Sequence, residues 1–473
     1  MNWVKKHKPP TTEAIKFNGQ PCNNLDDLWY TLHHSYNSAQ NRPINLCLLD
    51  EIPPSPTATW PPFSDAEVYE ALNKCSNSSA PGPDHLSWRH LKRILNDEEC
   101  MTNIVNIANV CINLSYWPTH FKKSFSIIIP KLNKLSYDTP KSFRPIVLLN
   151  TIGKLIEKAI SNRIQVHSII TNFLHPNQLG GIRQWSTTNA GVFLTHVVHA
   201  SWIKRLHTST LAFNIAQFFP LLNHQLLSFI IAKAGFDNKV TQFFSNYLTN
   251  RFTQYIWNQF TLPLFNTDVR VGQGSSLSPI LSALYVAPLF YIFEKRTMTL
   301  FIPVSLLSFV DDSLSVSQEK SYEKSNSILQ SSYSIISSLF ENFGFVIEHD
   351  KSEVFHFSRA TKKSKLPPLD LSPADGPILN PKDIWQYLRF FFDKKLSFRY
   401  HTYYYANKVI STIKSMKMLG NSTRGLSSVH KHLLYRTCVL PITLYGLQLW
   451  YFKGAPTFYL LKELKKMQWR AAL

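Results

Sequence analysis

Two adjacent carboxylates, Asp311 and Asp312, are the residues whose type and spacing most directly suggest chemistry in this 473-residue chain. Apolar runs lie on both sides of them, at residues 305–310 and 313–316. This pattern predicts a β-hairpin with both acids at its tip. Two carboxylates on one tight turn can hold a pair of Mg²⁺ ions, which would align a triphosphate with an attacking hydroxyl. An exposed Asp-Asp turn without function is the alternative, and the pair alone does not exclude it.

The charge of the chain favours a polyanionic partner. Lys and Arg number 50 against 30 Asp and Glu, which gives a net charge of +20. From Lys394 onward there are 14 basic residues and one acid, Glu463. Cations mixed with aromatic rings suit a surface that holds a nucleic-acid backbone and stacks on bases. A solvated basic face is the alternative, but the imbalance persists over about 80 residues. The interleaved rings are Tyr403, Tyr404, Tyr405, Trp450, Tyr451 and Trp469.

Six cysteines without any Cys-x-x-Cys pair predict reduced thiols in an intracellular protein, in the nucleus or the cytoplasm. The histidine pairs at 196/199 and 430/432 lack matching Cys or acid partners, so we expect no zinc site. Residues 1–10 have no apolar core and do not form a signal peptide. The uncharged run 275–293 contains Pro279, Pro288 and several serines, which favours a buried helix over a membrane span.

Cations end or begin two further apolar runs. Residues 125–130 read as a strand that leads to Lys131, and residues 142–149 read as a second strand that opens with Arg144. Two antiparallel strands that present these cations could clamp a triphosphate. Surface cations beside core strands fit the same pattern equally well.

A glycine-rich loop and a later lysine complete the set of candidate residues. The loop at residues 271–279 contains Gln273 and Gly274, and its glycines would let the backbone approach a base pair closely. Lys351, in the block 344–353, is predicted to lie on a strand. A lysine there is a candidate proton donor to a leaving pyrophosphate.

The order of these blocks resembles the reverse transcriptase domain of non-LTR (LINE-type) retrotransposons. The amino-acid sequences of the blocks are closest to those of the fungal type. The resemblance runs from about residue 80 to the end, and its most specific parts are residues 309–312, 272–275 and 142–145. Together these motifs are a strong signal, whereas each alone is weak.

The resemblance implies an α+β right-hand polymerase fold. Residues 1–60 are polar and rich in Pro, and this composition predicts a loosely ordered N-terminal extension. By the resemblance, fingers would follow at 61–200. A palm at 201–395 would carry the glycine-rich loop and the acidic hairpin, and a basic helical thumb would span 396–473. The implied activity is DNA synthesis on an RNA template, with a DNA primer, deoxynucleotide triphosphates and two Mg²⁺ ions.

The resemblance also assigns roles to single residues. Asp311 and Asp312 match the palm's metal-binding acidic pair. Phe219 matches the bulky residue that blocks a 2′-hydroxyl, which favours deoxynucleotides over ribonucleotides. The remaining matches are the triphosphate-binding residues of the fingers, the template-side loop and the later lysine: Lys131, Arg144, Gln273, Gly274 and Lys351.

One departure from the family pattern stands out. The first palm strand of the family carries an aspartate that bridges both metals, and this chain has Asn214 there. Asparagine offers one neutral oxygen, which is a poor ligand for Mg²⁺. Residues 158–236 contain no Asp or Glu, so we expect no neighbour to replace it. Metal affinity and rate should then fall by at least a few orders of magnitude. A tolerated variant with residual activity is the alternative.

Smaller departures point to a copy that has drifted without selection. The family tends to have glycine at the positions of His85 and Arg389, a small residue at Leu221 and a basic residue at Trp185. No endonuclease-like segment fits before the fingers and no ribonuclease H acid cluster follows the thumb, so the sequence reads as a truncated polymerase module.

Three hypotheses remain from the sequence. The first is an RNA-directed DNA polymerase by descent with impaired catalysis. The second is a non-enzymatic nucleic-acid-binding remnant of such an element. The third is another polymerase of the same architecture, such as an intron-encoded maturase or an RNA-dependent RNA polymerase, and Phe219 argues against it.

Overall fold

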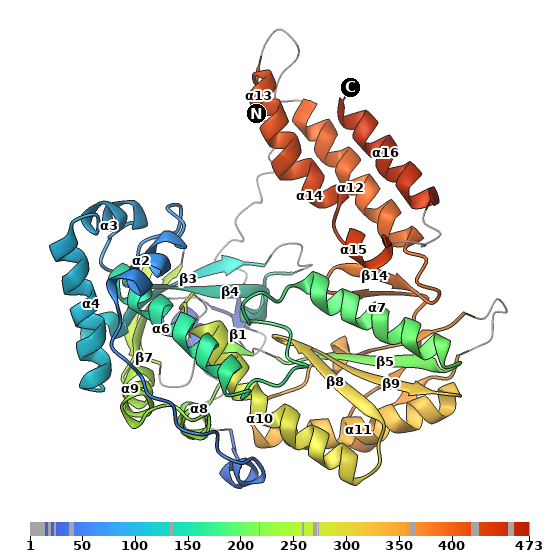
Figure 1. Ribbon diagram of the computed structural model, residues 1–473, viewed down its shortest axis with the longest axis horizontal. Helices are drawn as coiled ribbons and strands as arrows, with labels where there is room; N and C mark the ends of the chain where they lie inside the picture. Colours follow the sequence, from blue (N-terminus) through green and yellow to red (C-terminus); the bar gives the residue numbers. More distant parts are fainter. Residues whose placement is uncertain are drawn as a thin grey trace.

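The computed structural model describes residues 15–17, 20–22, 25–36, 42–131, 136–216, 218–257, 260–267, 272, 274–359, 366–417, 425–452 and 458–472. These residues form a mixed α+β fold with two four-stranded sheets, helices around both, and a group of helices at the C-terminus (Figure 1). The α+β class predicted from the sequence is confirmed.

The first four-stranded sheet carries the acidic hairpin. Its order is β10-β5-β9-β8 and all its pairings are antiparallel. Helices cover both faces, with α10 and α11 below the sheet and α7 above it in Figure 1. Because both faces are covered, even serines and threonines of these strands are buried. The elements are β5 (His207–Asn214), β8 (Val304–Phe309), β9 (Asp312–Glu319), β10 (Glu353–Phe357), α7 (Thr187–Ile203), α10 (Ser278–Thr299) and α11 (Tyr322–Asn342).

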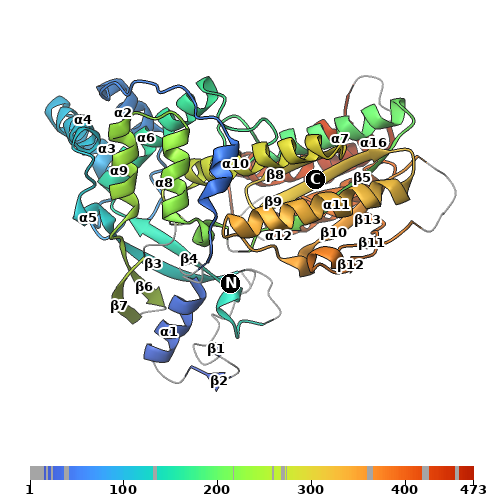
Figure 2. The same ribbon diagram turned by 90° about the horizontal axis from the view of Figure 1, so that it is seen from below.

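The second four-stranded sheet has the order β4-β3-β6-β7 and lies beside the first (Figure 2). Strands β3 and β4 form an antiparallel hairpin, as predicted, and β6 pairs in parallel with β3. The sheet therefore joins segments from both sides of residue 200, so a boundary there does not separate the two sheets. Local patterns cannot reveal such long-range parallel pairing. The strands are β3 (Lys123–Pro130), β4 (Phe143–Leu149), β6 (Phe252–Trp257) and β7 (Phe260–Asn266).

Helices pack beside the second sheet and at the left edge of Figure 1. Helix α2 begins at a capping box, in which the Ser64 side chain accepts from the backbone N–H of Glu67. This reciprocal pairing satisfies backbone N–H groups at the start of the helix. The helices are α2 (Asp65–Asn73), α3 (Trp88–Ile94), α4 (Glu98–Asn113), α5 (Thr119–Lys122), α6 (Thr151–Ile170), α8 (His224–Lys233) and α9 (Asn238–Leu248).

Part of the N-terminal segment, residues 25–36, forms a helix within the described residues. Helix α1 (Leu25–Tyr36) buries Leu28 and Leu32 in a cluster with Tyr255 and Trp257 of the second sheet. The expectation of a loosely ordered extension is therefore wrong for α1, because its apolar face finds partners far along the chain. Two short strands, β1 (Lys16–Phe17) and β2 (Gln20–Pro21), precede it.

Helix α10 is the buried helix that the uncharged run predicted. Nearly every side chain from Ser278 to Phe293 is buried against the surrounding helices and the first sheet. Within the described ranges, no helix is both long and apolar enough to cross a membrane.

The C-terminal part is mainly helical, as predicted, and its helices project from one side of the molecule (Figure 1). A hairpin of β13 and β14 connects it to the first sheet through a shared apolar cluster. The elements are β11 (Leu369–Asp370), β12 (Ile378–Leu379), β13 (Ile384–Tyr387), β14 (Phe390–Asp393), α12 (Arg399–Lys417), α13 (Ser428–Leu434), α14 (Leu440–Thr443), α15 (Leu447–Trp450) and α16 (Phe458–Ala472).

Candidate functional site

The two carboxylates lie at the tip of the β8–β9 hairpin, where the sequence placed them. Phe309 pairs with Asp312, which leaves Val310 and Asp311 as a two-residue turn. Val310 has a φ of +61°, a left-handed conformation that a β-branched residue rarely adopts. Such strain persists only where the surrounding structure holds it in place.

A segment before α7 holds this turn from one side. The Ser308 N–H donates to the Asn177 carbonyl at 3.1 Å, and the Leu179 N–H donates to the Ser308 carbonyl at 2.8 Å. A Cβ at Gly180 would lie 2.3 Å from the Val310 nitrogen. Glycine at 180 thus permits the close approach that supports the turn. Nothing in the local sequence indicates the partner of this segment.

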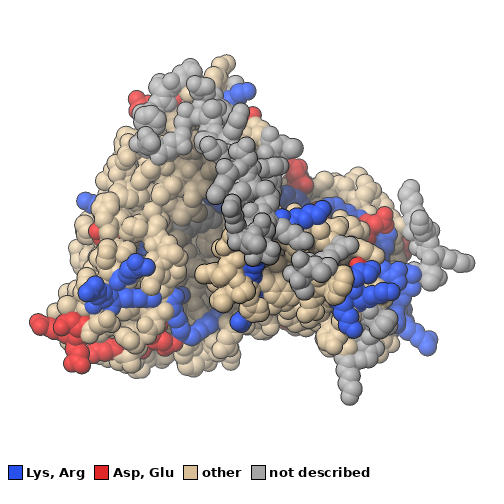
Figure 3. Space-filling model, turned by 90° about the horizontal axis from the view of Figure 1, so that it is seen from above, with Lys and Arg blue, Asp and Glu red and all other residues tan. Residues whose placement is uncertain are grey.

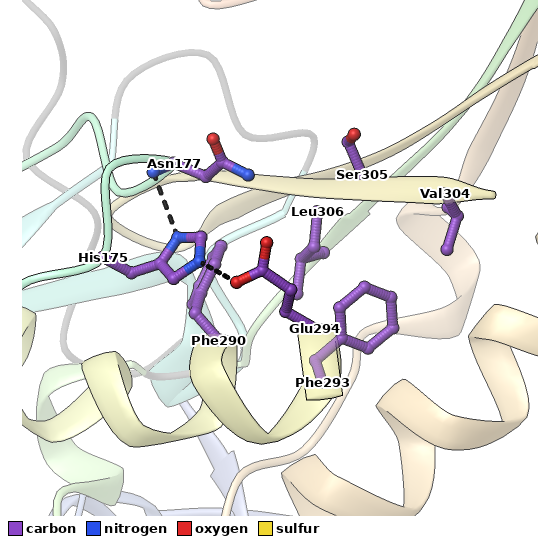
Figure 4. Close-up of a pocket in the computed structure, with 8 residues that line it drawn as sticks. All are labelled: His175, Asn177, Phe290, Phe293, Glu294, Val304, Ser305 and Leu306. Atoms are coloured by element: carbon purple, nitrogen blue, oxygen red, sulfur yellow. Dashed lines mark hydrogen bonds and ion pairs between the residues drawn. The ribbon is translucent and has the colours of Figure 1, made fainter. Parts of the chain in front are cut away.

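A small pocket lies behind the same segment, on the α10 side of β8 (Figure 4). The Nε2 atom of His175 lies 3.1 Å from a Glu294 carboxylate oxygen, and its Nδ1 accepts from the Asn177 N–H at 3.2 Å. These contacts fix the start of the segment that supports the acidic turn. The pocket lining includes none of the predicted site residues.

Asn214 lies directly beside the acidic pair. In the β5–β9 register Asn214 is opposite Asp312, and its side-chain amide donates a hydrogen bond to the Asp312 carboxylate. The backbone N–H of Ile215 also donates to the Asp311 carbonyl at 3.1 Å. The structure therefore brings together the three residues that the sequence assigned to the palm.

Glu348 is a neighbour of Asn214 that the sequence reasoning missed. The Glu348 N–H donates to the Asn214 carbonyl at 2.8 Å, and Ile347 forms an antiparallel bridge with Ile215. The prediction that no neighbour replaces the missing aspartate considered only residues 158–236, and it stays a prediction. In the structure, a segment that follows β9 by about 30 residues in sequence pairs with the end of β5, on the side of β5 away from β9. The available signal was Glu348 itself, an acid three residues before the candidate lysine Lys351.

The protein around the turn raises the pKa of both acids. For Asp312, burial and the negative charge of Asp311 raise the pKa to about 6, against the lowering effect of Asn214 and nearby cations. Desolvation also raises the pKa of Asp311; the Glu348 charge adds to the rise, while Lys351 and Arg144 oppose it. Two carboxylates that are costly to ionise favour a cation between them.

Lys351 lies close to the acids but not on a strand. It ends a 3₁₀ turn, His349–Lys351, that precedes β10, and its N–H donates to the Glu348 carbonyl at 3.0 Å. The strand prediction is wrong here because the chain must turn between the Ile347 bridge and β10. The Lys351 ammonium forms an ion pair with the Glu348 carboxylate.

Lys131 and Arg144 lie on the β3–β4 hairpin, as predicted. Arg144 pairs with Ile129, and the Lys131 N–H donates to the Ser142 carbonyl at 2.8 Å, so both cations project from the same face. Arg144 is exposed, and its charge acts on Asp311. The Lys131 ammonium donates to the Lys141 carbonyl at 2.7 Å.

The glycine-rich loop packs against β4. Gly274 has a φ of +133°, and a Cβ there would lie 2.2 Å from the Val147 carbonyl oxygen. Glycine is thus required for contact with this strand, and contact with a base pair stays a prediction. Gln273 lies outside the described residues. Ser275, which follows Gly274, donates through its Oγ to the buried Glu157 carboxylate at 2.6 Å. This hydrogen bond anchors the loop to α6.

Phe219 follows β5 in a short 3₁₀ turn, Phe219–Leu221. Its ring is half-buried and lies 5.4 Å from the ring of Phe218 in an edge-on arrangement. Leu221, one of the departures, is buried in the main core, which accounts for its size.

Two other departures occupy backbone positions that favour glycine. His85 has a φ of +52° and Arg389 a φ of +69°. Side chains are strained in this region, so the backbone agrees with the glycine that the resemblance expects there. Arg389 also brings a positive charge close enough to lower the pKa of Asp312.

The acidic turn fits Mg²⁺ in chemistry, since this ion prefers oxygen ligands such as those of Asp311 and Asp312. Its donor set is incomplete: within the described part of the chain, no three His, Cys, Asp or Glu side chains converge closely enough to hold a metal ion.

Figure 3 shows the face of the molecule on the side of the C-terminal helices. This face is hollowed at its middle, Lys and Arg gather mainly on the right-hand lobe, and most Asp and Glu lie at the left edge. The exposed aromatic side chains of α12 include Tyr403 and Tyr404, which were predicted stacking residues.

Comparisons with known proteins agree with this arrangement. Residues 129–420 match the family described as "Reverse transcriptase (RNA-dependent DNA polymerase)". The chain is 23% identical over 423 residues to the "Probable RNA-directed DNA polymerase from transposon BS" of Drosophila melanogaster, covering 87% of this chain and 44% of that protein. It is 24% identical over 418 residues to the "RNA-directed DNA polymerase from mobile element jockey" of the same species, covering 86% and 44%. The chain thus spans less than half the length of these relatives.

A solved structure of apo telomerase from Candida tropicalis is also similar. It shares 16% identity, covers 52% of each chain and gives a TM-score of 0.39.

Proposed function

Because the chain belongs to the reverse transcriptase (RNA-dependent DNA polymerase) family, we propose that it is the polymerase module of a non-LTR retrotransposon, impaired at Asn214. One observation carries the proposal: the Asp311–Asp312 turn lies directly beside Asn214 on the central strand of the sheet. The fungal type of the element is part of the proposal and has only the sequence resemblance behind it. Drift without selection is also part of it, supported by His85 and Arg389 at strained backbone positions.

The proposed substrates are an RNA template, a DNA primer and deoxynucleotide triphosphates. Asp311 and Asp312 would hold Mg²⁺, which when bound supplies the positive charge that aligns the triphosphate with the primer hydroxyl. Arg144 would bind the triphosphate from the β4 side, because it is exposed and its charge already acts on Asp311.

Three other residues have proposed roles around the nucleotide. Phe219 would exclude a 2′-hydroxyl, since its half-buried ring follows the strand that carries Asn214. Lys351 would give a proton to the leaving pyrophosphate. Its position beside both acids supports that role, although it must first leave Glu348. The second cation, Lys131, would act with Arg144 on the phosphates.

In this reading the basic C-terminal helices are the thumb, at 396–473, and would hold the template and primer. Their charge and their exposed tyrosines are the support. The proposed fingers span 61–200 and the proposed palm 201–395, and strands β6 and β7 from the palm range pair into the sheet that holds β3 and β4.

The test is primer extension on an RNA template with Mg²⁺ and deoxynucleotides, comparing the natural chain with Asn214→Asp. We expect the variant to extend at least about 1,000-fold faster, because it regains an anionic metal ligand on β5. Asn223→Asp is the matched control, since Asn223 caps α8 through its side-chain oxygen and aspartate caps equally well.

Each result has a clear meaning. Equal extension by the natural chain and Asn214→Asp would show a working enzyme and overturn the impairment. Extension by neither, with salt-dependent binding of primer and template by both, would favour the nucleic-acid-binding remnant instead. Extension with ribonucleotides but not deoxynucleotides would overturn the assigned substrate.

A further inference from the structure

We propose that Gln178 is a positioning residue for polymerisation, because its side chain fixes the segment on which the acidic turn rests. This inference rests on the proposed function and concerns the same site. Gln178 would not touch the substrate; it would act through the backbone of the strand that ends at the turn.

The side-chain amide of Gln178 joins two parts of the chain inside the protein. Gln178 is only 3% exposed. Its Nε2 donates to the Ala283 carbonyl of α10 at 2.9 Å, and its Oε1 accepts from the His175 N–H at 3.0 Å. Loss of this amide would leave a buried carbonyl and a buried N–H without partners, so its segment would shift to find new ones.

The segment that this amide holds pairs with the free edge of β8. Gln178 itself forms a parallel bridge with Ser308. The Ser308 N–H donates to the Asn177 carbonyl at 3.1 Å, and the Ser308 carbonyl accepts from the Leu179 N–H at 2.8 Å. Both backbone groups of Ser308, three residues before Asp311, are therefore bonded to the segment.

The acidic turn needs support of this kind because its backbone is strained. Val310 has a φ of +61°, and such a conformation persists only where its surroundings enforce it. The chain at Gly180 lies close against it, since a Cβ there would be 2.3 Å from the Val310 nitrogen. Gln178 is two residues before Gly180, so a shift at Gln178 would move this contact as well.

Helix α10 is the reference to which the segment is tied. The His175 ring lies at the start of the segment, with its Nε2 3.1 Å from Glu294 of α10 (Figure 4). Gln178 adds the second tie, to Ala283, more than two helical turns away on the same helix. Because α10 is almost wholly buried, these two ties give the turn a fixed place. A displacement of about 1 Å at reacting groups can lower a rate about 100-fold.

Asn109 on α4 provides a matched control. Its Nδ2 donates to the Phe63 carbonyl at 3.1 Å, and its Oδ1 accepts from the Phe63 N–H. This amide thus joins a helix to another chain segment with the same two kinds of hydrogen bond as Gln178. It differs in its place, because Phe63 leads into α2 and not to the acidic turn.

The experiment compares Gln178→Met with Asn109→Leu, each in the full chain that also carries Asn214→Asp. Both substitutions keep the approximate shape of the side chain and remove its hydrogen bonds. Primer extension on an RNA template gives kcat and the KM for deoxynucleotides. We expect Gln178→Met to lower kcat about 10- to 100-fold and to change KM less than about 2-fold, since the turn moves while the cations of β3–β4 stay in place. Asn109→Leu should change neither by more than about 2-fold.

Hydrogen exchange measures the support of the turn without any activity. The amides of residues 304–312 should exchange at least about 10-fold faster in Gln178→Met than in Asn109→Leu, because the segment no longer holds the edge of β8. Circular dichroism checks that both variants fold. Should Gln178→Met not fold, Gln178→Asn is measured in its place, because its amide is one methylene too short to reach both partners.

The outcomes separate this inference from the proposed function. If the Gln178 variant matches Asn109→Leu in kcat and in exchange, Gln178 is not a positioning residue and the proposed function stands. Faster exchange with an unchanged kcat also overturns the inference, since the reaction then tolerates a loosened turn. If Asn214→Asp alone extends no primer, the proposed function fails, and this inference fails with it.

Discussion

The two four-stranded sheets carry candidate site residues in different ways. On the β10-β5-β9-β8 sheet, backbone hydrogen bonds from three strand segments meet at Asn214, so its position is fixed whatever its side chain. On the β4-β3-β6-β7 sheet, Arg144 is an exposed side chain of the β3–β4 hairpin. No backbone hydrogen bond given for the described residues ties it to the acidic turn. The backbone of the first sheet would hold the same arrangement with aspartate at position 214. We expect substitutions there to act on stability, and those on the second sheet to act on binding.

The largest expected effect is on the core of the first sheet. Phe213→Ala removes a fully buried ring next in sequence to Asn214. The Phe213 ring packs edge-on against Tyr333 and near Phe340. The free energy of unfolding should fall by about 3–5 kcal/mol, since a cavity is left in a closed core. Urea denaturation followed by tryptophan fluorescence measures it.

The control for Phe213→Ala lies on the second sheet. Ile129→Ala removes an apolar side chain that is 46% exposed, opposite Arg144. Its effect should stay below about 1 kcal/mol. Equal losses for the two variants would contradict the idea that stability is concentrated in the first sheet.

The next effect is the pH dependence of the first sheet. His356 on β10 is fully buried with its Nδ1 2.8 Å from the Ser209 Oγ, and burial lowers its pKa to about 4. Between about pH 6.5 and 4, the His356 imidazole is therefore protonated in the unfolded chain and neutral in the folded chain. Stability should fall as the pH falls through this window, by about 2 kcal/mol at pH 5.

Thermal unfolding at pH 7 and pH 5 measures this loss, and His356→Asn should reduce it. His430 gives a matched control, because its Nδ1 also lies 2.8 Å from a serine hydroxyl, Ser427, but it is exposed on α13. A pH profile that His356→Asn leaves unaltered would refute the assignment.

Much of this site was predictable, for a physical reason. The acidic hairpin, the β3–β4 pair and the buried helix α10 all depend on local periodicity, which the sequence displays. Glu348 and Gly180 could not be placed, because their roles depend on partners more than 120 residues away along the chain, Asn214 and Val310. The strand assigned to Lys351 failed for a similar reason, since the Ile347–Ile215 bridge forces a turn there.

The smallest expected effect belongs to the second sheet and is seen only in substrate binding. Arg144→Ala, made in the Asn214→Asp background, should raise the KM for deoxynucleotides about 10-fold, or about 1.4 kcal/mol, because a bidentate phosphate contact is lost. Unfolding by urea should be unchanged, since Arg144 is exposed. Lys141→Ala is the control, since Lys141 is an exposed cation in the short 3₁₀ turn just before β4, and it should leave KM unaltered.

Arg144→Lys sharpens this test, because lysine keeps the charge but not the planar fork. If charge alone matters, lysine restores the KM; if bidentate geometry matters, it does not. An Arg144→Ala variant that lost stability rather than affinity would show that the second sheet, like the first, ties its site residues to the framework. The proposed difference between the two sheets, stability in the first and substrate binding in the second, would then be wrong.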